Sequence, residues 1–409
     1  MTDWISAAEA AERLGIKQAS LYAYVSRGVL ARRRGGDGRA SLFDADEVAG
    51  LARRGRPRRP PGATELIIES SLTEISGDRL RFRGHDAIAL AAERPFEEVA
   101  SLLWTGSLDS GGARWEATAE ALAAGTAAQS ALPAGTLPLE RLQVIVPALA
   151  ATDQLRLQLD HPAVIAAGRS LIAGMVGCLP LAGRPPASAS GPADHAEAAI
   201  AGRLVTRLCP AALDDGLTDA VRAALVLLAD HELAASTLAA RVAASMRADP
   251  YAVVATGLGA LGGALHGGAA LAAEVMLGSA RDPDEAPRVV GDLLRRGERL
   301  PGFGHFVYKT GDPRAVLLLD LIRTRAPGSP RLAVAEAVLA EARRRALPAP
   351  NIDFALAVLT GAAGMIHGAG EAIFAIARAA GWLAHALEEY DRNIPIRPRG
   401  IYTGPPAGS

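Results

Sequence analysis

The sequence predicts a mainly α-helical protein. From residue 96 onward, apolar residues recur three and four positions apart, which is the period of a helix that buries one face. Half of the 409 residues are apolar but only 4% are aromatic, and 43 glycines favour helices in close contact. No run of strands alternates with these segments, which argues against a parallel α/β sheet. The expected helices are 96–104, 116–123, 139–151, 197–208, 219–246, 284–296, 314–323, 331–345 and 372–389.

The composition narrows the class of protein and its compartment. A chain of 409 residues accommodates two or three domains of about 150 residues each. Two cysteines, Cys178 and Cys209, are too few for a disulfide framework or a zinc site. Residues 251–273 carry no formal charge but contain six glycines, which favours a buried helix-loop segment over a membrane span. No signal peptide is visible, so we expect a cytoplasmic protein without a metal or membrane contact.

A stiff linker divides the chain. The 43 basic and 44 acidic residues nearly cancel over the whole length, which by itself suggests neither nucleic acid nor an anionic membrane as a partner. Up to Pro61, however, 12 basic residues outnumber 7 acidic ones, a net charge of +5, and the remainder carries −6. Residues 55–62, Gly-Arg-Pro-Arg-Arg-Pro-Pro-Gly, cannot continue a helix. We therefore expect a small basic domain over 1–54 and a linker over 55–64.

The small basic domain has the pattern of a winged helix-turn-helix. Residues 6–9, Ser-Ala-Ala-Glu, fit a capping box that starts a first helix, and a second helix follows over 18–27 after a glycine turn. Residues 31–43 are typical of a glycine-turned hairpin, and a further capped helix starts at Asp44.

This arrangement resembles the MerR-like or excisionase-type domains that bind DNA. In such a domain the second helix would lie in the major groove and the arginines of the wing would contact phosphates. A small helical domain of the same shape that binds protein, or only packs on the rest of the chain, is the alternative. The residues expected to contact DNA are Ser20, Tyr22, Arg27, Arg32, Arg33, Arg34 and Arg39.

A β-hairpin is expected before the helices of the larger part. Residues 66–84 contain two short strand-like stretches around a turn at Gly77-Asp78. Farther along, residues 257–262 match the pattern G-x-G-x-x-G of dinucleotide-binding loops. No strand precedes this match and no βαβ unit surrounds it, so we reject a dinucleotide site and favour small-residue helix packing.

Histidines and a lone aspartate are the first candidates for chemistry. His266 and His305 adjoin glycines, and His231 follows an aspartate. A histidine beside glycine has an approachable ring, as a substrate pocket needs, whereas a helix cap or a structural core histidine is the alternative for each. Asp353 enters a long uncharged stretch at a helix start, which by itself favours a helix cap. Burial there would also make its carboxylate a stronger base.

Arginines near the end of the chain add a second kind of signal. Arg314 follows Asp-Pro, Arg378 lies within an apolar helix, and Arg397 and Arg399 flank Pro398. An arginine on an apolar face needs an anionic partner, and several together suit a di- or tricarboxylate. Internal salt bridges are the alternative.

Together these segments resemble the citrate synthase family in their order and spacing. The resemblance covers roughly residues 65–409 and leaves the small basic domain outside. The segments that carry it are 262–269 (Gly-Gly-Ala-Leu-His-Gly-Gly-Ala), 302–309 with 312–314 (Asp-Pro-Arg), 350–354 (Pro-Asn-Ile-Asp-Phe), 373–385 and 396–402, with 80–86 and 96–104 upstream.

The resemblance implies a mainly helical homodimer whose two domains close over a cleft. The large domain would comprise 65–267 and 365–409, and the small domain would comprise 268–364. The implied reaction condenses an acyl-CoA with oxaloacetate and then hydrolyses the thioester. Coenzyme A enters as part of the substrate, and no further cofactor or metal is implied.

The resemblance also assigns roles by motif. Asp353 would remove the α-proton of the thioester, His266 would stabilise the enol or enolate oxygen, and His305 would polarise the oxaloacetate carbonyl. The residues that would hold the carboxylates are His231, Arg314, Arg378 and Arg397, with Arg397 reaching in from the other subunit.

Departures from the family pattern bear on the substrate. Ala234, Ala270, Phe306 and Ala355 each stand where the family usually has a polar residue. We expect a larger or less polar pocket and a preference shifted toward propionyl-CoA and 2-methylcitrate. The alternative function is a transcription regulator whose synthase-like body senses a carboxylate or acyl-CoA without catalysis. The base Asp353 discriminates between the two, because a sensor does not need it, and its retention favours the enzyme.

Overall fold

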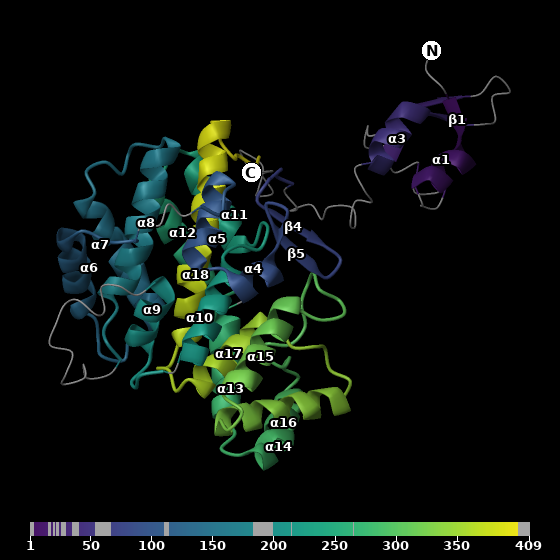
Figure 1. Ribbon diagram of the computed structural model, residues 1–409. Helices are drawn as coiled ribbons and strands as arrows, with labels where there is room; N and C mark the ends of the chain where they lie inside the picture. Colours follow the sequence, from purple (N-terminus) through teal and green to yellow (C-terminus); the bar gives the residue numbers. More distant parts are fainter. Residues whose placement is uncertain are drawn as a thin grey trace, which may run out of the picture. The chain divides into compact units, whose positions relative to one another are not determined.

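The larger part of the chain is almost entirely helical, which confirms the predicted fold class. The chain divides into two compact units, residues 1–69 and 70–409 (Figure 1). The predicted linker over 55–64 lies outside the described residues. The computed structural model describes residues 4–14, 18, 21, 24–25, 30–34, 41–53, 67–109, 114–182, 199–213, 215–264 and 266–399.

The small unit contains an antiparallel sheet and helices near the positions expected from the sequence. Ser6 Oγ accepts a hydrogen bond from the Glu9 N–H at 3.2 Å and caps the first helix, as the capping box predicts. Asp44 Oδ1 accepts from the Asp46 N–H at 2.9 Å and caps another. The elements are β1 (Trp4–Ser6), α1 (Ala7–Leu14), β2 (Arg32–Arg34), β3 (Ser41–Asp44) and α3 (Ala45–Arg53), with the sheet order β1-β3-β2.

The second predicted helix of the small unit is only partly described. Gln18, Leu21, Tyr24 and Val25 are helical, and the rest of 18–27 lies outside the described residues. The helices and the sheet share one apolar core, and pairing of β2 with β3 confirms the antiparallel strands of the predicted hairpin. The buried residues of this core are Ile5, Ala10, Ala11, Leu21, Leu30, Phe43, Ala45 and Val48.

A short antiparallel meander opens the larger unit and confirms a hairpin with its turn at Gly77-Asp78, but its first strand begins at Thr73, where the expected stretch 66–73 ends. Gly77 has φ +60° in the turn between the first two strands, a conformation that glycine adopts without strain. Leu80 and Phe82 are fully buried and join the sheet to the helices. The strands are β4 (Thr73–Ser76), β5 (Arg79–Phe82) and β6 (His85–Asp86), paired in that order.

The helices of the larger unit follow the meander. Helical periodicity correctly predicts most of them, with boundaries that differ by several residues. They are α4 (Ala87–Glu93), α5 (Phe96–Thr105), α6 (Ala119–Ser130), α7 (Pro138–Thr152), α8 (His161–Cys178), α9 (Ile200–Leu208), α10 (Asp215–Leu228), α11 (Ala235–Ser245), α12 (Pro250–Leu261), α13 (Gly268–Gly278), α14 (Ala286–Arg295), α15 (Pro313–Arg325), α16 (Pro330–Arg344), α17 (Ile352–Ala362) and α18 (Ala369–Arg392).

The single helix expected over 219–246 is wrong. The structure has two helices there, α10 and α11, joined by residues 229–234. Glu232 adopts φ +56° within this connection, a left-handed conformation that ends helical hydrogen bonding. The apolar periodicity runs through the break, so the sequence pattern alone does not reveal it. The break places His231 in a turn instead of on a helix.

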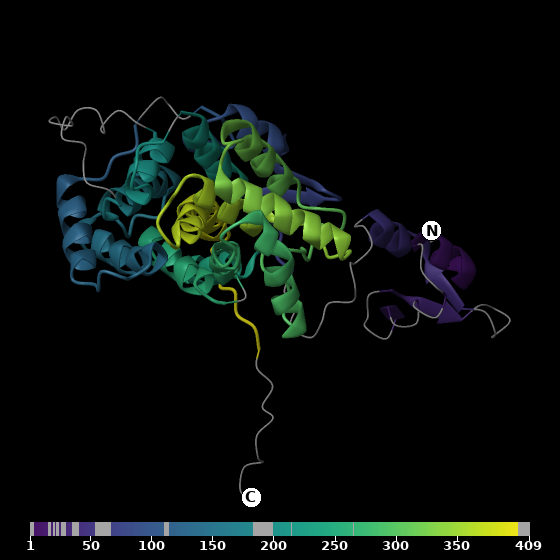
Figure 2. The same ribbon diagram turned by 90° about the horizontal axis from the view of Figure 1, so that it is seen from below.

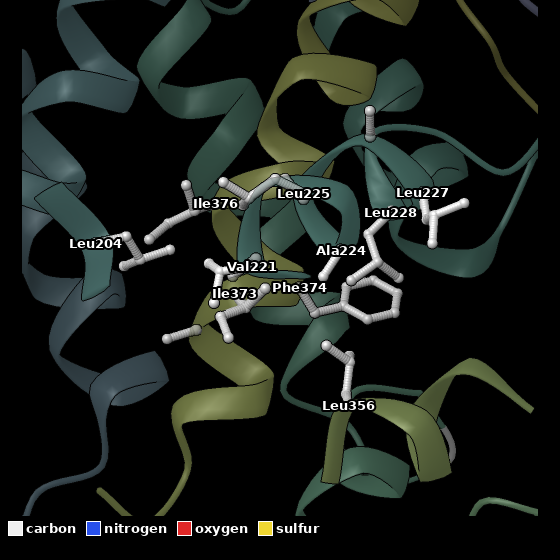
Figure 3. Close-up of a cluster of buried hydrophobic side chains, with 14 of the residues drawn as sticks. Leu204, Val221, Ala224, Leu225, Leu227, Leu228, Leu356, Ile373, Phe374 and Ile376 are labelled. Atoms are coloured by element: carbon white, nitrogen blue, oxygen red, sulfur yellow. The ribbon is translucent and has the colours of Figure 1, made fainter. Parts of the chain in front are cut away.

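Helix α18 forms the centre of the larger unit (Figure 1). Every residue from Ala369 to Leu387 is buried, so this helix is covered by neighbours on all sides. Figure 3 shows Ile373, Phe374 and Ile376 of α18 packed among the apolar side chains of α10. Leu204 of α9 and Leu356 of α17 close the same cluster. Polar residues on α18 are therefore held in a fixed position by packing around them.

The uncharged segment 251–273 is a helix-loop segment, as predicted, but it is only partly buried, because Thr256, Gly259, Gly262, Gly263 and Ala264 are exposed. It forms α12, a turn and the first part of α13. The glycines at 257–262 belong to α12 and its C-terminal cap, not to a strand-to-helix loop. A Cβ placed on Gly257 would lie 2.5 Å from the Trp382 ring, so small-residue packing explains this glycine. Among the described residues, no helix is long and apolar enough to cross a membrane.

The close approach of α12 to Trp382 predicts a stability difference between two glycine substitutions. Gly257→Ala should lower the free energy of unfolding by about 2–3 kcal/mol, because the added methyl overlaps a buried ring. Gly278→Ala is the matched helical control. It meets nothing within 4 Å and should raise stability by up to about 1 kcal/mol. Urea unfolding of both variants provides the measurement, and equal effects would contradict the packing argument.

Candidate active site

Two loop segments pair through their backbones and bring His305 near the start of α17. The Gly304 N–H donates to Ala349 O, and the Asn351 N–H donates to Gly302 O, both at 2.8 Å. Gly302 and Gly304 have φ of +77° and +79°, so both positions require the left-handed backbone that glycine supplies. A Cβ on Gly302 would also lie 2.7 Å from Phe354 Cβ. The glycines beside His305 therefore allow a close approach.

Asp353 does not cap α17, so the preference for a simple helix cap is corrected. Asn351 is the cap: its Oδ1 accepts from the N–H groups of Asp353 and Phe354 at 3.0 and 3.4 Å. The Asn351 Nδ2 donates to Gly304 O at 2.9 Å and ties the helix start to the histidine loop. The Asp353 carboxyl is thus not used by the helix. Burial raises its pKa to about 6, although Arg314 draws it downward.

His305 is held as a neutral hydrogen-bond donor. Its Nδ1 accepts from the N–H groups of Val307 and Tyr308 at 3.0 and 3.3 Å. An Nδ1 that accepts cannot carry a proton, so the hydrogen-bond network assigns the proton to Nε2. Burial and the nearby Arg314 guanidinium lower the pKa of His305 to about 4. At neutral pH the ring therefore offers an N–H without a positive charge.

His266 is neutral for the same physical reason but carries its proton on the other nitrogen. Its Nε2 lies 2.7 Å from Ser236 Oγ, and the Trp382 Nε1–H donates to that same oxygen at 3.3 Å. The Trp382 indole can only donate to this oxygen, and within the described residues the Ser236 hydroxyl has no acceptor other than His266 Nε2, so we assign its hydrogen to that nitrogen. The Nδ1–H of His266 is left as a donor. Burial, with Arg378 adding to it, lowers the pKa of His266 to about 4.

A contact between His231 and Tyr308 links the α10–α11 connection to the loop that contains His305. The His231 Nε2 lies 3.0 Å from the Tyr308 hydroxyl, and the His231 and His305 rings are 5.3 Å apart at an angle of 75°. Burial, Arg314 and Arg378 hold the pKa of His231 well below its usual value. The predicted trio of site histidines is therefore uncharged near neutrality.

Arg314 and Arg378 supply the positive charge of the site. Arg314 makes two hydrogen bonds to the Asp312 carboxylate, at 2.9 and 2.8 Å, and both residues are buried. Its Nη2 lies 3.5 Å from His305 Nε2, and because both atoms carry hydrogens this contact is a close approach and not a hydrogen bond. Arg378 donates from Nε to Leu228 O at 2.8 Å, and within the described residues no other hydrogen bond of its guanidinium is seen. Burial lowers the pKa of Arg378 to about 10. Its remaining donors suit an anionic ligand.

Arg397 does not join this group within the chain. Helix α18 ends at Arg392, and the chain that follows it leaves the helices (Figure 2). Ile396 still donates its N–H to Ser245 Oγ of α11 at 3.0 Å, and the next residue, Arg397, is exposed. Six of the seven predicted site residues therefore belong to one electrostatically coupled cluster, and the seventh lies outside it.

Sequence reasoning missed several residues that support the cluster. Asp312 had a usable signal, because an Asp-Pro pair is typical of a helix start, and it caps α15 while binding Arg314. Ser236 and Trp382 had none, since they lie 30 and 116 positions from His266 in the chain. Among the described residues, no group of three or more histidine, cysteine, aspartate or glutamate side chains has the geometry of a metal site.

Comparison with known proteins identifies the family to which the chain belongs. The family model described as citrate synthase, C-terminal domain, matches residues 63–399. The chain belongs to the citrate synthase family. It is 31% identical over 369 residues to citrate synthase 2 of Bacillus subtilis, covering 82% of this chain and 93% of the relative. It is also 31% identical over 365 residues to 2-methylcitrate synthase 1 of Corynebacterium glutamicum, with the same coverage.

Solved structures agree with the family assignment. The chain superimposes on citrate synthase from Thermoplasma acidophilum, in its ternary complex with carboxymethyl coenzyme A and oxaloacetate, with a TM-score of 0.67. The two sequences are 26% identical, and the match covers 84% of this chain and 95% of the other. These similarities confirm the prediction of a citrate synthase-type enzyme.

Asn351 binds both the start of α17 and the histidine loop, so its substitution should lower stability more than the loss of an ordinary helix cap. Asn351→Ala removes two cap hydrogen bonds and leaves the Gly304 carbonyl without its donor, so it should lower the free energy of unfolding by about 2–3 kcal/mol. Ser329→Ala removes only one cap bond, on α16, and should cost about 1 kcal/mol. Urea unfolding of the two variants tests this difference, which vanishes if Asn351 is only a cap.

Proposed function

We propose that this protein condenses an acyl-CoA with oxaloacetate and hydrolyses the resulting thioester, releasing a tricarboxylate and free coenzyme A without a metal. The observation that carries the proposal is the arrangement of the cluster, in which hydrogen bonds fix the ring donors of His266 and His305 and the helix cap leaves the Asp353 carboxyl unused. One carboxyl with a pKa of about 6, Asp353, shares its arginine neighbours with two neutral histidine donors, His266 and His305. Removal of a proton from carbon needs a base, which Asp353 supplies. The developing oxyanion and the ketone carbonyl each need a hydrogen-bond donor, which His266 and His305 supply.

In the first step the Asp353 carboxylate takes the α-proton of the thioester. A base with a pKa of about 6 is largely ionised at neutral pH and binds a proton more strongly than an ordinary aspartate. Negative charge develops on the thioester oxygen, where the Nδ1–H of His266 would meet it. A preorganised donor of this kind contributes about 3 kcal/mol to the transition state. Because His266 is neutral and held by Ser236, no reorientation is needed as charge develops.

In the second step the enolate carbon attacks the ketone carbon of oxaloacetate and a carbon–carbon bond forms. The Nε2–H of His305 would polarise the ketone and donate its proton to the new alkoxide. The proton that Asp353 has taken up then replaces it, so that His305 returns to its neutral form and Asp353 to its carboxylate. Arg314, Arg378 and His231 would hold the two carboxylates, since the guanidinium donors of Arg378 are largely unused by the protein. Water then cleaves the thioester and coenzyme A leaves as a thiol.

A homodimer would complete the site. Arg397 is exposed and lies beyond the end of α18, away from the cluster in its own chain. In the proposed assembly it reaches a carboxylate in the other subunit. The Thermoplasma acidophilum relative binds oxaloacetate and a coenzyme A derivative together, which supports the same pair of ligands here.

A free-thiol release assay tests the proposed reaction. With oxaloacetate and acetyl-CoA or propionyl-CoA, the purified protein should release coenzyme A, and Asp353→Asn should lower kcat at least about 100-fold by removing the base. Asp320→Asn, at an exposed aspartate paired with Arg323 on α15, is the control and should retain full activity. Absence of thiol release from the unmutated protein with both thioesters would favour the metabolite-sensing alternative.

The acyl preference is proposed to be propionyl-CoA over acetyl-CoA. Ala270 and Ala355 are fully buried where the family pattern usually has polar residues, and the relatives of the chain include a 2-methylcitrate synthase at 31% identity. Two of the departures, however, do not enlarge a buried pocket. Phe306 is 89% exposed, and Ala234 precedes α11 without capping it. A kcat/KM for acetyl-CoA equal to or above that for propionyl-CoA, in the same assay, rejects the preference.

We also propose that the small unit is a winged helix-turn-helix that binds DNA. The sheet and helices of this unit support the proposal, together with its charge of +5 up to Pro61 and three consecutive arginines on β2. Arg32 and Arg33 are exposed, and Arg33 also covers the Trp4 ring at 4.6 Å. Predicted contact residues Ser20, Tyr22, Arg27 and Arg39 lie outside the described residues.

Salt dependence of DNA binding tests the role of β2. If the three arginines of 32–34 contact phosphates, their joint replacement by alanine should reduce the slope of log K against log salt by about 3. The three consecutive arginines of 343–345, in the larger unit, are the matched control, and their replacement should leave the slope unchanged. Equal slopes for the unmutated protein and both variants, measured with duplex DNA by fluorescence anisotropy, would remove the DNA role.

A further inference from the structure

One face of α18 carries polar side chains toward the α10–α11 connection. Arg378, Trp382, His385, Glu388 and Glu389 recur three to four positions apart, which places them on one side of the helix. We call this set the polar stripe of α18. Arg378 and Trp382 already belong to the candidate site through Leu228 O and Ser236. The remaining members reach residues that the proposed chemistry does not use.

His385 contacts Asp230, the residue directly before His231. Both side chains are completely buried, and His385 Nε2 lies 3.3 Å from Asp230 Oδ2. The same oxygen accepts from the Thr73 hydroxyl at 2.5 Å. Burial alone would raise the pKa of Asp230, but His385, Arg378 and Thr73 outweigh burial and lower it. Asp230 is therefore a buried carboxylate whose position depends on the hydrogen bonds of two elements.

The tautomer of His385 is set by Arg241 of α11. Arg241 Nη1 lies 2.6 Å from His385 Nδ1, and a guanidinium can only donate. Nδ1 must then be the acceptor, which leaves His385 neutral with its hydrogen on Nε2, directed to Asp230. Arg241 is itself fully buried and is held by Glu388 and Glu389. Arg241 thus donates to Glu388 and Glu389 on one side and to His385 on the other, and His385 donates in turn to Asp230.

The segment that contains Asp230 approaches α18 so closely that no Cβ fits between them. On Gly381, an added Cβ would lie 2.4 Å from Ala229 O and 2.5 Å from Asp230 Oδ1. Arg378 holds the preceding carbonyl of Leu228 from the same helix. Residues 228–230, the end of α10 and the start of the connection, are therefore held against α18 directly before His231. The left-handed Glu232 follows.

We propose that His385 is a positioning residue for oxaloacetate binding: by donating to Asp230 it fixes the direction of His231 and keeps a carboxylate beside Arg378. The inference rests on the proposed function, because it takes His231 and Arg378 as carboxylate ligands. His385 has no exposed surface and touches no substrate in this role. Its effect passes through Asp230 alone.

Two amide substitutions separate the two hydrogen bonds of His385. In His385→Gln the side-chain amide nitrogen takes the place of Nε2 and still donates to Asp230. In His385→Asn the side-chain amide oxygen takes the place of Nδ1. It still accepts from Arg241, but the side chain no longer reaches Asp230. We expect the asparagine variant to raise the KM for oxaloacetate about ten-fold or more, with the KM for acyl-CoA changed less than three-fold. The glutamine variant should restore the oxaloacetate KM to within about three-fold of the unmutated value.

Urea unfolding of the two His385 variants distinguishes a positioning role from a merely structural one. Each variant loses one buried hydrogen bond, so both should unfold at similarly lowered urea midpoints although only one changes the oxaloacetate KM. His161→Asn is the control: His161 pairs with Asp391 at the exposed end of α18, and its loss should leave both KM values unchanged. Equal increases in oxaloacetate KM in both His385 variants, or a parallel rise of both KM values, would overturn the positioning role.

A measurement without substrate distinguishes failure of this inference from failure of the proposed function. In full-length protein labelled with ¹³C at histidine Cε1, the His231 signal is assigned by its loss in His231→Gln. His385→Asn should shift this signal and His385→Gln should not. A shift in both variants, or in neither, would overturn the inference. Lack of thiol release from the unmutated protein rejects the proposed function alone, because the His231 signal does not depend on turnover.

Discussion

The burial of α18 is the constraint on which the larger unit depends. Every residue from Ala369 to Leu387 is shielded from solvent, so each polar group on this helix must find a partner inside the protein. Apolar residues of α18 form the core with α10, while its polar stripe reaches the break between α10 and α11. The break leaves backbone groups without helical partners, and Arg378 satisfies one of them at Leu228. Core packing and the placement of His231 are therefore consequences of the same helix.

The candidate site also depends on a second set of contacts, between the histidine loop and the start of α17. Backbone pairing of 302–304 with 349–351 brings a histidine loop to the start of α17, where Asn351 caps the helix and also binds the loop. Asp353 follows the cap. Within the described residues its carboxylate accepts no hydrogen bond. A base on the first turn of a helix is well aimed, because its backbone is fixed on both sides.

Burial shifts the acids and bases of the site in opposite directions, and both shifts suit the proposed chemistry. It disfavours charge on every group, so the pKa of Asp353 rises to about 6 while those of His266 and His305 fall to about 4. The positive charge of Arg314 and Arg378 limits the first shift and strengthens the second. Near neutrality this environment yields a largely ionised base beside uncharged donors.

Local sequence patterns determined the helical class, the opening hairpin and several helix starts, because capping and periodicity involve residues only a few positions apart. The resemblance to the citrate synthase family also pointed to six residues that share one cluster. The tertiary structure decided what such patterns do not contain: the break at 229–234, where apolar periodicity continues, and Asn351 in place of Asp353 as the cap. It also decided the partners of His266 and His385, which lie 30 to 155 positions away in the chain. Hydrogen bonds of that range depend on how helices pack, and packing follows from the whole chain at once.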